Sequence, residues 1–172
     1  MDNDELRKKL NALQAGDKTA LEEIYDNLKT PMYTIILRVT RDRSLSEDIL
    51  QEVFVKLYQS PPVRAKNPRA YMFQMARNQA VDGVRKQPRF ADLDDVESLA
   101  YSPDDDDLKM DIDQAMQTLP LQECQIVSLH INGELKFREI ADMLGIPLGT
   151  AIWKYHKAIG RLRTHLSDGG AI

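Results

Sequence analysis

The sequence predicts an all-α protein with two small helical domains, a flexible acidic linker between them, and a helix-turn-helix in the second domain. Three observations lead to this prediction. Apolar residues recur at helical intervals along most of the chain, without the alternation typical of strands. One central stretch is acidic and lacks any helical period. A glycine lies between the last two helical segments. A chain of 172 residues is long enough for one domain or two small ones. The expected division is 1–88, 89–109 and 110–172.

The first domain consists of amphipathic segments whose boundaries are marked by helix-starting and helix-breaking residues. A short polar helix is expected near 4–14 and a second helix over about 17–29. Pro31 is expected to open a third helix, because proline is well tolerated at a first helical position. Ser44 to Glu47 fits a capping box at the start of the next helix. The last helix is expected over about 68–86.

The apolar spacing also predicts which side chains face the core. The expected inward residues are, in chain order, Leu21, Ile24, Tyr25, Leu28, Met32, Ile35, Ile36, Val39, Leu50, Val53, Phe54, Leu57, Tyr58, Met72, Met75, Ala76, Ala80 and Val84.

The charge is distributed unevenly along the chain. The formal net charge is −4, but residues 87–113 carry 2 Lys/Arg and 10 Asp/Glu. Like-charge repulsion and low apolar content predict a flexible linker over 89–109. Either this linker is a solvated tether, or its negative charge mimics nucleic acid in a basic channel of a partner. Residues 64–89 hold seven cations against Asp82 alone, which suits contact with phosphates.

The C-terminal domain ends in the most specific pattern of the chain. Two helices, about 110–118 and 121–131, precede it. Gly145 to Leu148 is expected to form a turn between two further helices. In the second of these helices, Ala151, Tyr155, Ala158 and Leu162 are expected to face inward, and the opposite stripe holds Thr150, Trp153, Lys154, Lys157 and Arg161. A bracing helix followed by a helix with outward cations and donors is typical of a DNA-binding helix-turn-helix.

The helix over 68–86 carries a second candidate nucleic-acid surface. Phe73, Arg77 and Arg85 are expected on its outward face, flanked by Tyr71 and Asn78. Aromatic rings can stack on unpaired bases, Arg can bind phosphate, and Asn can read a base edge. The alternative is a core aromatic residue beside a solvated cationic face.

Two neighbouring stretches also allow a plain and a functional interpretation. The loop Gln59–Asn67 carries Arg64 and Lys66 and is either a simple connection or part of a pocket that reads bases. The helix before it has an outward face with Asp48, Gln51, Glu52 and Lys56. That face is either ordinary solvated surface or an acidic and amide patch that docks on a basic helix of a partner.

The residue content argues against an enzyme and against bound metal or cofactor. Cys124 is the only cysteine, and the three histidines lack metal-ligand spacing. The sequence has no P-loop and no catalytic carboxylate cluster, so an enzyme acting on nucleic acid is disfavoured. The charged start of the chain and the absence of a long apolar run predict a cytoplasmic protein that does not insert into a membrane.

Three motifs together resemble the extracytoplasmic-function (ECF) sigma factors of the bacterial sigma-70 family. Ser46–Tyr58 is similar to the D-x-x-Q-[ED]-x-F helix of that family. Asn67–Lys86 is similar to its R-x-W-L-x-x-I-A-R-N-x-x-x-D-x-x-R helix. The third motif is Glu139–Thr150 with the basic helix behind it. The resemblance covers the chain from about Ala20 to Leu166 and implies two helical domains that bind core RNA polymerase and promoter DNA.

The resemblance also implies a role for each surface. Asp48, Gln51 and Glu52 match the face that binds the clamp helices of the polymerase β′ subunit, and the β subunit is a further expected contact. Arg64, Lys66, Tyr71, Phe73, Arg77, Asn78 and Arg85 fall where the family captures the melted minus-10 element. Thr150, Trp153, Lys154, Lys157 and Arg161 lie at or near the positions that contact the minus-35 element. The linker is expected to thread toward the RNA exit channel, and an anti-sigma partner, which could hold the protein at the membrane, is expected.

The chain departs from the family pattern at a few positions. Tyr71 stands where the family usually has Trp, and Lys136 stands where a Ser usually caps the helix. Ile152 and Trp153 replace the usual residues at the start of the recognition helix, so the family pattern does not fix the preferred minus-35 sequence. The alternative to a sigma factor is a stand-alone helix-turn-helix regulator that binds duplex operators.

Overall fold

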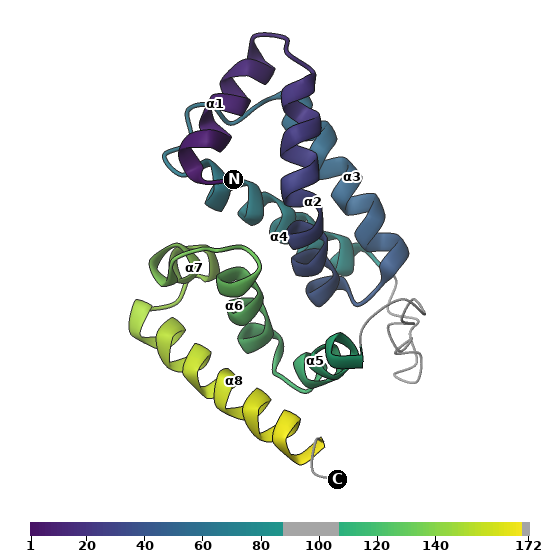
Figure 1. Ribbon diagram of the computed structural model, residues 1–172, viewed down its shortest axis with the longest axis vertical. Coiled ribbons are helices and arrows are strands. Elements are labelled where there is room, and N and C mark those ends of the chain that lie inside the picture. Colours follow the sequence, from purple (N-terminus) through teal and green to yellow (C-terminus); the bar gives the residue numbers. More distant parts are fainter. Residues whose placement is uncertain (88–106, 170–172) are drawn as a thin grey trace. The chain divides into compact units, whose positions relative to one another are not determined.

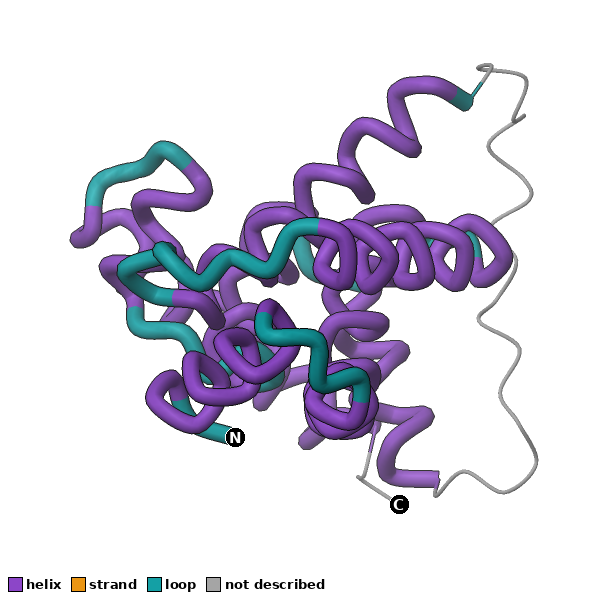
Figure 2. Tube along the Cα trace, turned by 90° about the horizontal axis from the view of Figure 1, so that it is seen from above, coloured by secondary structure: helices purple, strands orange, loops and turns teal. Residues whose placement is uncertain are grey.

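The computed structural model describes residues 1–87 and 107–169 of the chain. The chain divides into two compact units, Met1–Asp92 and Leu93–Ile172. Across the described residues both units contain helices and connecting loops and no strand (Figure 2). The all-α class predicted from the apolar spacing is therefore confirmed. Each unit is described by itself.

The first unit contains helices α1 to α4 (Figure 1). Their bounds are Asn3–Gln14, Thr19–Thr40, Arg43–Gln59 and Pro68–Lys86. Helix α2 packs against α1, α3 and α4, so it is the central element of the unit. A capping box starts α1: the Asp2 carboxylate accepts from the Glu5 backbone N–H at 2.9 Å, and the Glu5 carboxylate accepts from the Asp2 N–H at 3.1 Å.

Helix α2 continues through Pro31, so the prediction that Pro31 opens a separate helix is wrong. An interior proline costs about 3 kcal/mol, because it removes one backbone hydrogen bond and crowds the preceding turn. Burial offsets that cost here. Ile24 and Leu28 before the proline and Met32 and Ile36 after it form one buried stripe at four-residue intervals, in phase across Pro31. Breaking the helix at this point would take half of the stripe out of the core.

Helix α3 begins two residues earlier than the predicted capping box implied. Its N-cap is Asp42, whose carboxylate accepts from the Leu45 backbone N–H at 2.9 Å, and Ser44 lies within the first turn. Two side chains expected to face the core are also exposed instead: Tyr58 on α3 and Val84 on α4. Each is the last residue of the apolar stripe predicted for its helix.

The second unit contains α5 to α8, with bounds Asp107–Gln117, Leu121–Ile131, Phe137–Leu144 and Leu148–Gly169. Helix α8 packs against α5, α6 and α7. Its Ala158 lies in a cluster with Met116, Leu119, Cys124 and Val127, all buried. The last three residues of the expected linker belong to α5, which starts at Asp107, and 89–106 lies outside the described residues.

The turn between α7 and α8 has the predicted glycine. Gly145 is the C-cap of α7 and adopts φ +65°, in the left-handed region that favours glycine. Ile146 then donates its backbone N–H to the Ala141 carbonyl at 3.0 Å. At the other end of α7, the Glu139 carboxylate accepts from the Lys136 backbone N–H at 2.8 Å. The Glu139 bond therefore helps to cap this helix, whose N-cap residue is Lys136.

Replacing Gly145 by Ala is expected to lower the free energy of unfolding of the second unit by about 1 kcal/mol, because a Cβ disfavours positive φ. The matched control is Gly160→Ala. Gly160 lies inside α8, where an added Cβ would meet open space, so Ala there should raise stability by about 0.5–1 kcal/mol. Urea unfolding of the full chain, followed by circular dichroism, measures both. Equal effects of the two substitutions would contradict this assignment of the turn.

Candidate functional site

The exposed face of α4 is defined by four polar or aromatic side chains. Tyr71, Gln74, Asn78 and Arg85 are exposed and recur at intervals of three, four and seven residues, so they share one side of the helix. The Tyr71 ring is 49% exposed. The face offers one ring for stacking, two amides for hydrogen bonds and one cation, a combination that suits an unpaired nucleic-acid strand.

Phe73 does not belong to this face, and its predicted outward position is wrong. Its side chain is fully buried, and the Arg69 guanidinium lies 5.4 Å from the ring centroid. Arg77, expected on the same outward stripe, is half-buried, and burial lowers the pKa of its guanidinium. The buried stripe of α4 therefore runs through Phe73, which rotates the exposed face toward Tyr71 and Asn78 and away from Arg77.

The loop before α4 is compact and presents its cations to solvent. Arg64 and Lys66 are exposed. Val63 donates its backbone N–H to the Pro61 carbonyl at 2.8 Å. The loop ends at Asn67, whose side chain accepts from the Ala70 N–H at 3.0 Å and caps α4. Two exposed cations thus lie on the loop that leads directly into α4.

The outward face of α3 is acidic and amide-rich, as expected. Asp48, Gln51 and Glu52 are exposed, together with Lys56. These four side chains, with Val55 and Gln59, line a shallow hollow of about 440 Å³. Such a face can accept cations and hydrogen-bond donors from a partner helix.

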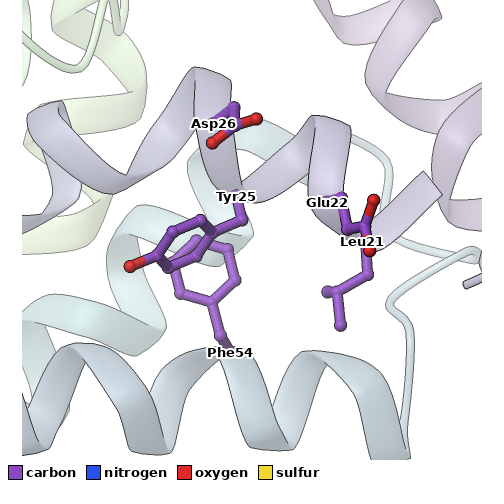
Figure 3. Close-up of a pocket in the computed structure, with 5 residues that line it drawn as sticks. All are labelled: Leu21, Glu22, Tyr25, Asp26 and Phe54. Carbon is purple, nitrogen blue, oxygen red and sulfur yellow. The ribbon is translucent and has the colours of Figure 1, made fainter. Parts of the chain in front are cut away.

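An apolar groove lies on another side of α3, where it meets α2 (Figure 3). Its volume is about 330 Å³, and its apolar wall is formed by Leu21, Tyr25 and Phe54. The Tyr25 and Phe54 rings meet edge to face, with centroids 4.9 Å apart. Glu22 and Asp26 also line it. The apolar spacing predicts that Tyr25 faces the core. This prediction is wrong, because the Tyr25 side chain is 41% exposed and lines this groove.

The outward face of α8 is formed by Trp153, His156 and Lys157. All three are exposed, Trp153 to 58%. The Lys157 ammonium lies 4.6 Å from the centroid of the Trp153 ring. A cation over an aromatic face is attracted by the ring quadrupole, so the two side chains support one another. On the inward side of α8, the Tyr155 ring packs edge to face against His130 and Phe137, with ring centroids 4.9 and 5.0 Å apart.

Two cations predicted for the same outward stripe turn instead toward α6. Lys154 donates from its Nζ to the Gln122 side-chain oxygen. Arg161 forms an ion pair of 2.7 Å with Glu123, which is buried. The recognition stripe expected from sequence is therefore divided: Trp153 and Lys157 face solvent, whereas Lys154 and Arg161 tie α8 to the start of α6.

Known protein families match both units. The family model for sigma-70 region 2 matches residues 24–90, and the model for sigma-70 region 4 matches residues 109–162. The chain belongs to the sigma-70 family. A stand-alone helix-turn-helix regulator is not supported, because the region 2 match lies outside the helix-turn-helix altogether.

Curated relatives assign this sigma factor to the ECF group. It is 26% identical to the ECF RNA polymerase sigma factor SigW of Bacillus subtilis, over 95% of this chain and 97% of SigW. It is 27% identical to the ECF RNA polymerase sigma factor RpoE of Cereibacter sphaeroides, over 88% of each chain. The sequence-based recognition of an ECF sigma factor is confirmed, and with it the role of an RNA polymerase sigma factor in transcription initiation.

Solved structures show the same fold. CnrH, in complex with the cytosolic domain of CnrY, superposes with a TM-score of 0.66 at 15% identity, over 97% of this chain and 99% of that one. The sigma factor RpoE of Bartonella quintana, in complex with the anti-sigma factor NepR, gives a TM-score of 0.63 at 16% identity. The match covers 85% of this chain and 95% of that one.

Two exposed side chains in this sigma factor were missed by the sequence reasoning. Gln74 lies on the exposed face of α4 between Tyr71 and Asn78, and His156 lies beside Lys157 on α8. Helical spacing alone contains the signal for both. Gln74 is three residues after Tyr71, and His156 is three residues after Trp153, so each follows an exposed aromatic ring on the same side of its helix.

The described residues, 1–87 and 107–169, contain no group of three or more His, Cys, Asp or Glu side chains placed to hold a metal ion. Over the same ranges, no helix combines the length and the hydropathy that a bilayer-spanning segment requires.

Proposed function

We propose that the two units of this sigma factor divide promoter recognition between them. Residues 1–88 bind core polymerase and the minus-10 element, residues 110–172 bind the minus-35 element, and 89–109 links them through the polymerase. The observation that carries the proposal is the pair of separate exposed faces, on α4 and on α8, each combining aromatic and cationic side chains in a region that the sigma-70 family matches.

The minus-10 surface proposed here comprises Tyr71, Gln74, Asn78 and Arg85 on α4 with Arg64 and Lys66 on the loop. Stacking of unpaired bases on the Tyr71 ring favours the melted strand over the duplex, because the ring offers no comparable contact to a base inside the stack. The cations neutralise phosphates on either side. Phe73 acts from the core by supporting this helix, and the half-buried Arg77 lies at its edge.

The minus-35 surface proposed here is centred on Trp153, His156 and Lys157, with Thr150 at the start of the helix. A helix of this kind enters the major groove with its first turns near base edges. Trp153 offers an apolar surface to a thymine methyl group, and Lys157 offers a cation to phosphate. Lys154 and Arg161 hold α8 on α6, and the part of the Arg161 side chain that stays exposed (44%) is a further candidate for a phosphate contact.

The polymerase-docking surface proposed here is the outward face of α3, with Asp48, Gln51 and Glu52 as acceptors for the β′ clamp helices. The protein performs no bond chemistry of its own: strand opening is driven by binding energy, so it is a transcription factor and not an enzyme. We place it in the cytoplasm, where core polymerase and promoter DNA are found. An anti-sigma partner, like the NepR bound to RpoE in the solved complex from Bartonella quintana, could hold it inactive there or at the membrane.

In vitro transcription with core polymerase on a randomised promoter library tests the proposal as a whole. Initiation should be selective at two sequence blocks separated by a spacer. Each block should be lost independently: substitutions on the α4 face should relax the block nearer the start site, and substitutions on the α8 face the block farther away. Absence of initiation with core polymerase would refute the proposed function.

Tyr71→Ala is expected to reduce promoter opening while leaving core binding intact. Base stacking on an aromatic side chain contributes about 1–3 kcal/mol per base, so opening should fall roughly five- to 150-fold. Permanganate reactivity of unpaired thymines measures opening, and native gel electrophoresis measures core binding. Tyr71→Phe keeps the ring and should open promoters normally.

Phe73→Ala provides the contrast for that prediction. Because Phe73 is fully buried, its truncation is expected to destabilise the first unit by about 3–5 kcal/mol and to impair opening only through loss of fold. Normal opening by Tyr71→Ala would contradict the proposed stacking role.

Lys157→Ala is expected to weaken duplex binding uniformly across sequences and to lower the slope of log affinity against log salt by about one. Lys154→Ala is the matched control, since it removes the same charge from a side chain that is bonded to Gln122. The control should change the salt slope less. Fluorescence anisotropy of a labelled minus-35 duplex over a salt series measures both, and equal slopes for Lys157→Ala and the unmodified protein would exclude the phosphate contact.

A further inference from the structure

One guanidinium from α1 holds the backbone of the loop that precedes α4. Arg7 donates from Nη1 to the Ala65 carbonyl at 3.0 Å and from Nη2 to the Lys66 carbonyl at 2.9 Å. The residues joined are 58 and 59 positions apart in the sequence. These bonds connect the first helix of the chain to the part of the loop that carries Arg64 and Lys66.

Two bonds to successive carbonyls constrain the loop more than a single bond does. In an extended backbone successive carbonyls point to opposite sides, so both can reach one guanidinium only when the chain bends between them. The planar fork of Arg suits such a pair of acceptors, and a Lys ammonium would act as a single point charge. Arg7 therefore fixes the bend at Ala65 and Lys66 and the directions in which the side chains on either side leave the backbone.

The start of α1 also anchors the next residues of the chain. The Asn3 side-chain oxygen accepts from the Arg69 backbone N–H at 3.1 Å. The Arg69 side chain is buried and donates from Nη1 to the Met1 carbonyl at 3.0 Å. Contacts from the first residues of the chain and from α1 therefore bracket the junction between the loop and α4.

The contacts of Arg7 add little to the packing of α1 itself. That helix is already fixed by the buried side chains of Leu6, Leu10 and Leu13 and by its own capping box. The loop has an internal turn, in which Ala65 donates its N–H to the Pro62 carbonyl at 3.1 Å. What Arg7 adds is a defined orientation of the backbone at 65–66 relative to α4.

We propose that Arg7 is a positioning residue for promoter reading: it touches no DNA itself and fixes the loop carrying Arg64 and Lys66 in the conformation that reads the melted minus-10 strand. This inference rests on the proposed function of the loop and the α4 face. It assigns α1 a part in sequence discrimination, in addition to its part in the core.

The test compares Arg7→Ala, Arg7→Lys and the matched control Lys8→Ala, which removes the same charge from an exposed position on the same helix. The readout is the ratio of open-complex formation on a preferred promoter to that on promoters with single-base substitutions in the minus-10 element. Arg7→Ala should lower this ratio roughly tenfold, through loss of two charge-assisted hydrogen bonds that order the loop. The ratio for Arg7→Lys should lie between those of Arg7→Ala and the unmodified protein. Lys8→Ala should leave the ratio unchanged.

Two further measurements separate positioning from loss of fold. Discrimination against minus-35 substitutions and binding to core polymerase should stay as in the unmodified protein. Hydrogen exchange at the backbone amides of 63–67 should speed up in Arg7→Ala, with the exchange of α2 unchanged. Should Arg7→Ala fail to fold, Arg7→Lys keeps the charge and one bond, and its intermediate ratio carries the test.

The outcomes distinguish this inference from the function on which it rests. Absence of promoter-selective initiation by the unmodified protein would overturn the proposed function. Selective initiation by the unmodified protein together with an unchanged minus-10 ratio in Arg7→Ala would overturn the positioning role alone. An equal loss of discrimination at both promoter elements would overturn it too, because that result indicates general unfolding.

Discussion

Burial of one apolar stripe per helix is the constraint on which the rest of this structure depends. Small units bury only about 60% of the surface that their unfolded chains expose, so every helix must give one side to the core. The remaining side is then the only surface available to a partner. In the first unit the stripe is anchored by the long helix α2, which continues through Pro31 because Ile24, Leu28, Met32 and Ile36 are all buried against its neighbours. The exposed faces of α3 and α4, proposed above as partner surfaces, are what this packing leaves uncovered.

The same constraint explains what the sequence could and could not predict. Spacing and local chemistry in the sequence predict that the helices exist. They also predict the glycine turn at Gly145 and the acidic outward face of α3. The rotation of α4 could not be predicted, because its sequence allows either Phe73 or Tyr71 to face inward, and only the packing of α4 against α1, α2 and α3 selects Phe73. The continuity of α2 is hard to predict for a related reason: Pro31 locally favours a helix start, and only the burial of an apolar stripe that stays in phase on both sides keeps the helix unbroken.

Electrostatic pairing determines which cations of α8 remain on its outward face, and helical spacing does not predict this pairing. Lys154 and Lys157 look equivalent in the sequence, being cations three residues apart on one helix. In the fold, Lys154 and Arg161 bond Gln122 and the buried Glu123, and Lys157 is left beside Trp153 on the outward face. Few cations therefore remain on that face, and the protein as a whole is net negative. So small a positive surface does not favour tight binding to one short duplex element by itself, which agrees with the proposal that both units bind the promoter.

Trp153 also gives this protein an unusual experimental property. It is the only tryptophan in the chain, and its ring is 58% exposed with an ammonium 4.6 Å from its centroid. Tryptophan emission, excited at a wavelength that tyrosine does not absorb, therefore originates from a single location, the outward face of α8. Any ligand that covers this face or displaces the Lys157 ammonium changes the polarity around the indole. The native chain thus carries its own optical reporter for occupancy of one surface, and binding there can be followed without attaching a dye.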